Sequence, residues 1–458
     1  MAKNHAADVE RSTFVRHGKL RRSNGWANAL RIFLTAALVV GLSGVATVAY
    51  AVWGLVQDVR TVDLGNEGDM VGVGNQSIDG ALTVLLVGSD TREGQAYQDG
   101  EEGELNDVNL MLHVSADHKN ATVVSFPRDM MLPFPSCPGP NGEEGYYPAM
   151  SEQQLNSAMM YGGLPCVART ISELTGMDIP NASLITFDGV IGVSNAIGGV
   201  DVCLAQPIVD PNTDLDLPAG EVTLQGWDAL QFLRTRHGVG DGGDTSRISN
   251  QQVFMSALVR KLRSAETLSD PVKVYGLAKA GVDNMTLSSS MASVQFMQQV
   301  AGTVKDIDLD RINFVQYPTL PHPYEEGRLT PDRESGDALF EIIKSGQPFE
   351  VGSTGAGAVS PDDPAATDPE NPAETPTETD PATGLPIDPA TGLPIDPTTG
   401  WPIDPETGWP IDPATGLATD PATITPAPPA DDGTVKLPDN ITGQSASKET
   451  CSSGRTAL

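Results

Sequence analysis

Cysteine and histidine are scarce in this chain of 458 residues, which contains four cysteines and six histidines. No two cysteines form a C-x-x-C pair, and no histidine and cysteine cluster in the spacing of a zinc site, so the sequence gives no indication of zinc. Cys137 and Cys166 flank a segment rich in glycine, proline and glutamate, and we expect a disulfide between them. Buried or free thiols are the alternative, and Cys203 and Cys451 are left without an assigned partner.

Positive charge is also scarce. Aspartate and glutamate number 60 against 28 lysines and arginines, which gives a formal net charge of -32. Over residues 32–350 there are 18 bases and 41 acids, a net charge of -23. A protein that binds nucleic acid needs a basic surface, so the charge of this chain excludes nucleic acid as a partner.

One segment lacks charge altogether: residues 32–56 contain no acidic or basic side chain. A helix of this length spans the roughly 30 Å of a bilayer's hydrocarbon core. Residues 1–31 hold seven bases and two acids, so we expect a transmembrane anchor with its N-terminus in the cytoplasm, followed by a linker over 57–79. The alternative is a signal peptide cleaved after Ala49–Ala51, although the apolar run is longer than is usual for one. Either way, most of the chain lies outside the cytoplasm.

Apolar side chains become rare near the C-terminus. Residues 380–419 are five copies of an eight-residue unit that begins with Asp-Pro, and residues 351–458 carry 17 acids against 3 bases. Proline excludes helix and continuous sheet, and so few apolar side chains cannot offset the entropy lost on ordering. We therefore expect a disordered, acidic, extended tail over 346–458, either a featureless spacer or a segment that contacts the cell wall.

Between residues 80 and 345, apolar runs alternate with helical patterns. Ala81–Val87 is a continuous apolar run, as is typical of a buried strand. Further strands are expected at Val108–Ser115, Ala121–Phe126, Leu184–Phe187, Val200–Leu204 and Asn313–Tyr317, and helices at Leu164–Leu174, Gly189–Ala196, Trp227–Leu233 and Ile248–Arg263. The alternation predicts an α/β domain with a mixed central sheet flanked by helices, in which a ligand binds at the strand ends.

Arginines and aspartates recur in this region in short polar runs. The runs are Gly88–Arg92, Asn106–Asp107, Phe126–Asp129, Arg234–His237 and Asp244–Arg247. Guanidinium groups pair bidentately with phosphate oxygens and stay charged at any physiological pH. The aspartates would repel a phosphate unless a cation lay between them, and Mg²⁺ is commonly bound by one or two carboxylates together with substrate phosphates. The pattern predicts a Mg²⁺-dependent site for a multiply charged anion.

Taken in order, these runs resemble the LytR-CpsA-Psr (LCP) family. The matching blocks are GSDTR (Gly88–Arg92), NDVNLMLHV (Asn106–Val114), SFPRD (Ser125–Asp129), L-N-x-A (Leu155–Ala158), DALQFLRTRH (Asp228–His237) and GDTSR-x-x-N-QQ (Gly243–Gln252). The resemblance is close over 81–265 and continues to about residue 320. It implies an α-β-α fold with a hydrophobic pocket for a polyprenyl chain, behind a single N-terminal anchor.

The resemblance also implies an activity. Members of this family in Gram-positive bacteria transfer a glycopolymer from polyprenyl pyrophosphate to the C6 hydroxyl of N-acetylmuramic acid in peptidoglycan, through a phosphodiester, and release polyprenyl phosphate. Asp90 and Asp107 match the family residues that hold Mg²⁺, or Mn²⁺ in its place. The residues that match the pyrophosphate-binding set are Arg92, Arg128, Arg234, Arg236, Arg247 and Gln251.

The acceptor hydroxyl needs a proton acceptor, and both Asp90 and Asp244 are candidates. With the arginines at 92, 128, 234 and 236 these two aspartates complete the predicted catalytic set. Water as the acceptor would make the protein a polyprenyl-pyrophosphate hydrolase. A site without chemistry would make it a protein that captures wall polymers, and both alternatives remain open.

Three local expectations complete the prediction. Asn250 stands where the family often has arginine, so we expect it to orient the site rather than carry charge. Arg234 and Arg236 would diverge on a helix but share a face in an extended segment, so the helix before them is expected to end near Leu233. The apolar run Leu110–Leu112 is expected in the core of the sheet.

Overall fold

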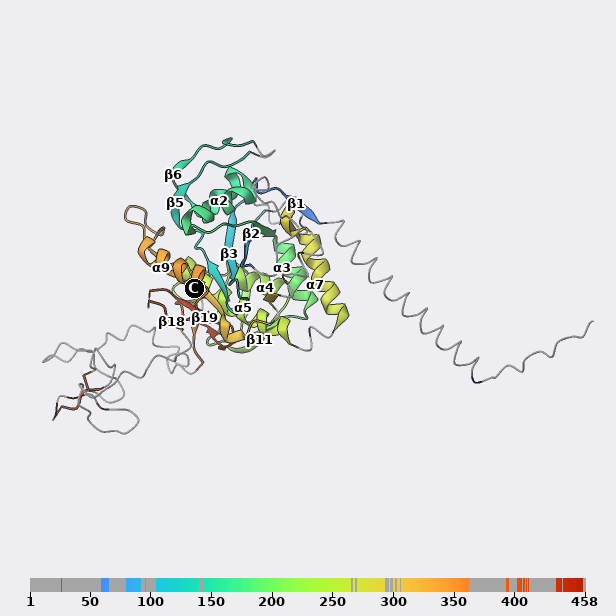
Figure 1. Cartoon of the computed structure of the whole chain (residues 1–458). Coiled ribbons are helices and arrows are strands. Elements are labelled where there is room, and N and C mark those ends of the chain that lie inside the picture. Colours follow the sequence, from blue (N-terminus) through green and yellow to red (C-terminus); the bar gives the residue numbers. More distant parts are fainter. Residues whose placement is uncertain are drawn as a thin grey trace, which may run out of the picture. The chain divides into compact units, whose positions relative to one another are not determined.

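A computed structural model gives the fold of the chain (Figure 1). The residues that it describes are 26, 59–65, 80–91, 95, 104–139, 143–264, 267, 270–292, 296, 300, 303–304, 306–361, 393–394, 402–405, 407, 409, 411, 434–438 and 440–455. The chain divides into two units, Met1–Gln57 and Asp58–Leu458. The predicted basic segment and anchor lie outside the described residues, apart from Trp26. Of the helices that are described, none has the length and apolar character needed to cross a membrane.

Within the described part of Asp58–Leu458, the main sheet has eight strands in the order β1-β12-β7-β2-β3-β4-β13-β19. Their bounds are β1 Arg60–Val62, β12 Met285–Ser288, β7 Asn181–Ile185, β2 Leu82–Ser89, β3 Asn106–Val114, β4 Ala121–Ser125, β13 Ile312–Gln316 and β19 Gly443–Ser445. Strand β2 runs parallel to β7 and antiparallel to β3, while β4 runs antiparallel to β3 and parallel to β13. The predicted mixed sheet is confirmed.

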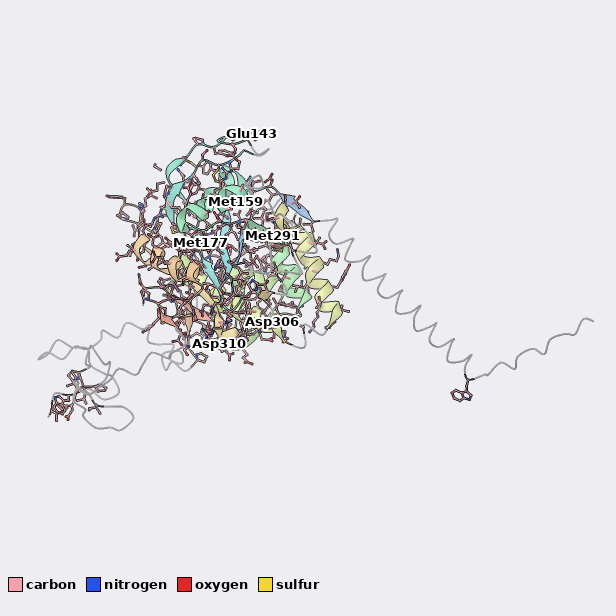
Figure 2. All side chains as sticks on the ribbon, in the orientation of Figure 1. Glu143, Met159, Met177, Met291, Asp306 and Asp310 are labelled. Atoms are coloured by element: carbon pink, nitrogen blue, oxygen red, sulfur yellow. A yellow bond between two sulfur atoms is a disulfide. The ribbon has the colours of Figure 1, made fainter. Side chains whose placement is uncertain are left out.

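Helices cover both faces of this sheet (Figure 1). The helices are α2 Gly163–Thr175, α3 Phe187–Ala196, α4 Trp227–Arg234, α5 Asp244–Arg263, α7 Pro271–Asn284 and α9 Arg333–Ser345, with short 3-10 helices at Leu155–Tyr161, Ser289–Met291 and Leu309–Arg311. Successive strand residues point to opposite faces. Leu85 and Met111 therefore pack with α2 and α9, while Leu82 and Leu112 pack with α5 on the other face. Met177, just beyond α2, belongs to the first of these cores (Figure 2).

The predicted elements are present with small shifts at their ends. Helix α2 ends at Thr175, one residue beyond the predicted Leu174, because Gly176 adopts the left-handed conformation (φ 60°) that closes a helix. Phe187 begins α3 instead of ending a strand, and α5 starts at Asp244, four residues before the predicted Ile248. The earlier start matters for function, because it places Asp244 and Arg247 in the first turn of a buried helix.

Smaller paired strands surround the main sheet. They are the hairpins β5 Met131–Phe134 with β6 Met150–Gln154, β9 Ile208–Asp210 with β10 Leu215–Leu217, and β14 Thr319–Pro321 with β15 Leu329–Pro331. A second sheet has the order β11-β8-β20-β17, with β11 at Gly220–Leu224, β8 at Val200–Leu204, β20 at Cys451–Ser452 and β17 at Ala358–Val359. A parallel pair joins β16 Phe349–Glu350 to β18 Val435–Lys436.

These pairs correct the prediction of a disordered tail from residue 346 onward. Strand β19 is the edge of the main sheet beside β13, and β20 lies between β8 and β17. Ile441 and Ala446 are fully buried, and Cys451 forms a disulfide with Cys203 across 248 residues of sequence. The prediction was wrong for these residues because each returning strand is only two or three residues long and carries little apolar pattern. Most of the repeats at 380–419 lie outside the described residues.

Candidate active site

Several strands end at one edge of the main sheet. The C-terminal ends of β2, β4, β7 and β13 meet there beside the N-terminal end of β3, because β3 runs antiparallel to its two neighbours. Asp90 follows β2, Asp107 is the second residue of β3, and Arg128 lies three residues beyond β4. The sheet thus gathers residues from three separate sequence motifs at the edge where α/β proteins bind ligands.

A β-bulge directs Asp107 into this edge. Gly88 lies opposite Val108 and Ser89 lies opposite Asn106, which leaves Asp107 without an opposing residue on β2. Bulges of this kind occur beside active sites and re-aim a side chain. The neighbouring Asn106 is fully buried, and its amide donates to the Leu155 carbonyl at 3.0 Å.

Four charged groups form one network at this edge. The Arg128 guanidinium pairs with the Asp107 carboxylate, and the backbone N–H of Arg128 donates to Asp244 Oδ2 at 3.1 Å. Arg247 Nη2 lies 2.6 Å from Asp244 Oδ1 and donates to the Asp107 carbonyl at 2.9 Å. The network therefore joins β3, the turn after β4 and the first turn of α5.

Burial and mutual charge set the electrostatics of this network. Burial lowers the pKa of Arg128, but the carboxylates of Asp107, Asp244 and Asp129 outweigh burial and leave it above its ordinary value. The pKa of Arg247 is lowered, first by complete burial and then by repulsion from Arg128 and Arg236. Arginine stays charged in proteins, so Arg247 is a buried cation that an additional anion would stabilise.

Several buried donors at this edge of the sheet lack acceptors. The Nε–H groups of Arg128, Arg236 and Arg247 are buried and have no hydrogen-bond partner among the described residues. An unsatisfied buried donor costs about 1–3 kcal/mol, and more when it belongs to a charged group. Three such donors on three arginines fit a site that is completed by a bound oxyanion.

A second cluster centres on Asp129, which is buried, with 5% of the residue exposed. Its Oδ2 accepts from Arg236 Nη2 at 2.8 Å, and its Oδ1 accepts from Arg328 Nη1 at 2.9 Å and from Gln154 Nε2 at 2.6 Å. Sequence reasoning missed Arg328, which lies in the β14–β15 hairpin outside every matched motif. The hairpin follows β13, another strand that ends at this edge, but no local motif marks Arg328 in the sequence.

Arg234 and Arg236 do not share one face, contrary to the expectation. Helix α4 ends at Arg234, one residue later than predicted. The Arg234 guanidinium lies 4.5 Å from the centre of the Phe187 ring, whereas Arg236 pairs with Asp129. Because Arg234 keeps helical geometry and Thr235 turns the chain away (ψ 135°), the two side chains serve different parts of the site.

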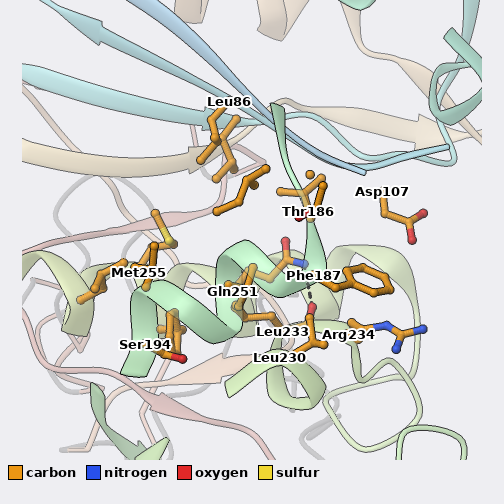
Figure 3. Close-up of a pocket in the computed structure, with 18 of the residues that line it drawn as sticks. Leu86, Asp107, Thr186, Phe187, Ser194, Leu230, Leu233, Arg234, Gln251 and Met255 are labelled. Atoms are coloured by element: carbon orange, nitrogen blue, oxygen red, sulfur yellow. Dashed lines mark hydrogen bonds between the residues drawn. The ribbon is translucent and has the colours of Figure 1, made fainter. Parts of the chain in front are cut away.

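Two amides on α5 fix the end of α4. Gln251 Nε2 donates to the Leu233 carbonyl and Asn250 Nδ2 donates to the Phe232 carbonyl, both at 2.8 Å. The last carbonyls of a helix lack partners within the helix, so these amides satisfy them. The expectation that Asn250 orients the site fits this contact, since Asn250 supports the helix that carries Arg234. Gln251 also lines the cavity beside Arg234 (Figure 3).

An apolar cavity of about 290 Å³ lies beneath these charges. Leu86, Val190, Val193, Leu230, Phe254 and Met255 are among the side chains that line it. Figure 3 shows Arg234 and Asp107 at one end of this cavity, and Leu86 and Met255 toward the other. Leu110 is buried (8% exposed), as expected for a core residue, and also lines the cavity, whereas Met111 is fully buried on the opposite face.

Asp90 and Asp107 are the predicted metal ligands. Asp90 Oδ1 accepts the Leu105 N–H at 2.7 Å, and Asp107 pairs with Arg128. The described residues contain no group of three or more His, Cys, Asp or Glu side chains placed to hold a metal ion. Mg²⁺ commonly takes one or two carboxylates and completes its shell with water and substrate phosphates, so the carboxylate chemistry of these two residues suits such an ion. The predicted Arg92 lies outside the described residues.

Two disulfides brace the surroundings of the site. The expected bond between Cys137 and Cys166 is confirmed, and it ties the loop that projects at Glu143 to the start of α2 (Figure 2). The bond between Cys203 and Cys451 secures the returning C-terminal residues. In particular, Arg455 N donates to the Gly238 carbonyl and Gly240 N donates to the Ser453 carbonyl, both at 2.8 Å. The C-terminal segment thereby holds the loop between Arg236 and Asp244.

An apolar cavity beneath a rim of arginines and carboxylates is the arrangement of an α/β protein that binds an amphiphilic anion. Sequence comparison identifies the family. The model described as the LytR_cpsA_psr family matches residues 59–337. The chain belongs to the LytR-CpsA-Psr family.

Similar proteins include the "Cell wall biosynthesis protein LcpA" of Corynebacterium glutamicum, which is 29% identical over 294 residues, or 59% of this chain and 56% of that protein. The chain thus spans about half the length of that relative. The "Polyisoprenyl-teichoic acid--peptidoglycan teichoic acid transferase TagU" of Enterococcus faecalis is 24% identical over 54% of this chain and 76% of that protein. The solved structure of the "LytR-Csp2A-Psr enzyme from Actinomyces oris" has a TM-score of 0.45 and 22% identity, and covers 58% of this chain and 90% of that one.

Proposed function

We propose that this protein is a transferase that joins a polyprenyl-pyrophosphate-linked glycopolymer to peptidoglycan. The observation that carries the proposal is the apolar cavity with arginines at its mouth. A polyprenyl chain suits the aliphatic lining, and a pyrophosphate suits Arg128 and Arg247, whose buried Nε–H groups lack acceptors. Arg236, which was predicted for the same set, pairs with Asp129 instead of lining the cavity. The name of the TagU relative, which joins a polyisoprenyl-linked polymer to peptidoglycan, supports this reaction class.

In the proposed reaction the C6 hydroxyl oxygen of an N-acetylmuramic acid residue attacks the phosphorus that carries the glycan. The bond between that phosphorus and the bridging oxygen breaks, so polyprenyl phosphate leaves and the glycan is joined through one phosphodiester. Negative charge builds on the bridging and outer oxygens, where fixed guanidinium groups stabilise it. We assign this role to Arg234 and Arg247, which line the cavity, and to Arg128, which pairs with Asp107 at the edge above it.

The acceptor's proton has two candidate destinations. Asp244 has a side chain that is 3% exposed and is held by Arg247 and by the Arg128 backbone, which suits it to positioning arginines. Asp90 is half-buried and is also assigned to the metal, so a comparison of Asp90→Asn with Asp244→Asn would decide which group takes the proton. Mg²⁺ or Mn²⁺ held by Asp90 and Asp107 would neutralise the pyrophosphate, and removal of divalent cations with EDTA should then reduce transfer.

The proposed location is the outer face of the membrane, with residues 32–56 as a single-pass anchor and the N-terminus in the cytoplasm. Two disulfides support an oxidising compartment. In intact cells, an added protease should digest the domain and spare residues 1–31. Protection of the domain until the cells are lysed would contradict this location.

The test of the reaction uses the full chain in detergent with Mg²⁺, a polyprenyl-pyrophosphate oligosaccharide and a soluble peptidoglycan fragment, with the products measured by mass spectrometry. A glycan joined to the fragment through a single phosphate supports the transferase. Polyprenyl phosphate released without a joined product indicates a hydrolase instead. Donor binding without any turnover indicates a capture protein.

A further inference from the structure

The arginines of the site extend beyond the cavity mouth toward β13. Arg234, Arg247 and Asp107 line the apolar cavity, but Asp129, Arg236 and Arg328 do not. These last three come from the turn after β4, the loop after α4 and the hairpin after β13. In the sheet order β7-β2-β3-β4-β13, the cavity lies under the β7-β2-β3 side, and this second cluster lies on the β4-β13 side.

The second cluster carries a net positive charge that one bound anion would neutralise. Asp129 accepts hydrogen bonds from both guanidinium groups, so one carboxylate balances two arginines and a net charge of one remains. Their side chains are 32% (Arg236) and 37% (Arg328) exposed, whereas the Asp129 side chain is only 8% exposed. The carboxylate is thus fixed below the surface, and the guanidinium groups are the parts that a soluble ligand can reach.

The buried anchor also orients Arg328. Gln154 Nε2 donates to the same Asp129 oxygen that accepts from Arg328, and the backbone N–H of Leu329 donates to the Asp129 carbonyl at 3.2 Å. Leu329 forms a bridge to Met130. A hairpin residue held at both its side chain and its neighbour's backbone is preorganised for binding, which lowers the entropy cost of capturing a ligand.

We propose that Arg328, together with Arg236, forms an oxyanion subsite that binds a carboxylate of the peptidoglycan acceptor. This proposal rests on the transferase function proposed above. The donor's lipid and pyrophosphate occupy the β7-β2-β3 side, so the β4-β13 side is left for the second substrate. The stem peptide of peptidoglycan carries carboxylates close to the muramic acid, and arginine binds carboxylates through paired N–H donors. The subsite would favour an acceptor with free carboxylates over an amidated one.

The experiment compares two acceptors with the full chain: a disaccharide-peptide fragment with free carboxylates, and the same fragment with those groups amidated. We expect the wild type to have a KM about tenfold lower for the free carboxylate, which corresponds to one charge-assisted contact. Arg328→Gln should lose this preference by raising the KM for the carboxylate acceptor, with kcat and the donor KM close to those of the wild type. Arg328→Lys should recover part of the preference.

Arg169→Gln is the matched control, because Arg169 pairs with exposed Glu144 on another part of the domain. A preference that persists in Arg328→Gln would overturn the subsite. A raised donor KM in that variant would assign Arg328 to a donor phosphate and overturn the acceptor assignment. Equal losses with both acceptors, together with a lower Tm, would show a structural role only.

Failure of the proposed function can be told apart from failure of the subsite. If the wild type transfers glycan to neither fragment, the transferase proposal fails, and equilibrium binding of the same two fragments still tests the subsite. Tighter binding of the carboxylate fragment by the wild type than by Arg328→Gln would support it. Equal affinities for both fragments in both proteins would overturn it.

Discussion

The cavity and the rim above it differ in almost every physical respect, although they share residues such as Arg247 and Asp107. The cavity is lined by aliphatic and aromatic side chains from α3, α4, α5 and the sheet. The rim consists of the two charged clusters above the cavity, namely Asp107, Arg128, Asp244 and Arg247, and Asp129, Arg236 and Arg328. Several of its buried N–H donors lack acceptors. Burial of an arginine is costly unless an anion compensates it, so a protein would not keep this rim beside an apolar cavity for stability alone.

The contrast indicates a ligand with two unlike ends. An apolar chain gains free energy in the cavity at about 0.8 kcal/mol for each methylene group removed from water. The charged end gains from preorganised donors that need not move when charge develops. The two regions should therefore respond differently to mutation, one through affinity for the chain and the other through the rate of transfer.

Loss of the rim should have the largest effect. Arg128→Ala removes the guanidinium that pairs with Asp107 and lies near Asp244, and we expect transfer to fall by about 10²- to 10³-fold, as for loss of a single preorganised donor. Steady-state kinetics with product analysis would measure this. The control is Arg169→Ala, whose surface ion pair with Glu144 lies outside the site. Near-normal transfer by a folded Arg128→Ala protein would show that the rim does not contribute to catalysis.

Filling the cavity should have the next largest effect. Val193→Trp puts a larger side chain into the cavity wall. Two or more methylene groups of the lipid would then stay in water instead of being buried, so the donor KM should rise about tenfold or more. The kcat should change little, because the rim is intact. Val272→Trp is the control, since Val272 is 76% exposed on α7. An unchanged donor KM in a folded Val193→Trp protein would show that the lipid binds elsewhere.

The position of the rim loop between Arg236 and Asp244 depends on the C-terminal segment, which the sequence did not indicate. Replacing Cys203 and Cys451 together by serine should lower stability by about 3 kcal/mol. It should also lower transfer several-fold, because residues 453–455 hold the loop between Arg236 and Asp244. Thermal unfolding and kinetics would measure both effects. The matched comparison is the Cys137→Ser/Cys166→Ser pair, whose loop is shorter. An unchanged Tm without the Cys203–Cys451 bond would show that the segment docks without needing it.

His113 lies at the end of β3 away from the site. Its titration should therefore change the stability of the protein at acidic pH and leave the cavity and the rim unaffected at neutral pH. Burial lowers the pKa of His113 to about 4, and its Nδ1 lies 3.0 Å from Thr83 Oγ1. The unfolded chain binds a proton near pH 6.5 and the folded protein does not, so stability falls as pH drops from about 6.5 to 4. In His113→Gln the loss between pH 7 and pH 4.5 should be smaller by about 2 kcal/mol. Urea unfolding at pH 7 and pH 4.5 would test this, and an identical pH dependence in both proteins would contradict it.

The sequence predicted most of the rim because its residues sit in short polar runs at the ends of the predicted strands and helices. Asp107, Arg128 and Arg247 were found in this way and lie together. Arg328 could not be found from a motif, because its place depends on a hairpin that returns to Asp129 from a distant strand. Pairing between segments far apart in sequence leaves no local pattern.

The returning C-terminal strands escaped prediction for the same reason. Strands as short as Gly443–Ser445 take their stability from the edge of a sheet that already exists, and composition described only the acidic repeats before them. The cavity was predicted only in part. Alternation along β3 places Leu110 in the cavity and Met111 in the core, which the apolar run alone does not show.

The most direct test of the central claim, that the cavity and the rim hold two ends of one donor, is a chain-length series. Transfer would be measured for wild type, Val193→Trp and Arg128→Ala with donors of long and short prenyl chains. We expect the defect of Val193→Trp to disappear with the short chain, because that donor does not fill the cavity, while the defect of Arg128→Ala persists with both donors. Defects that are independent of chain length in both variants would contradict the claim.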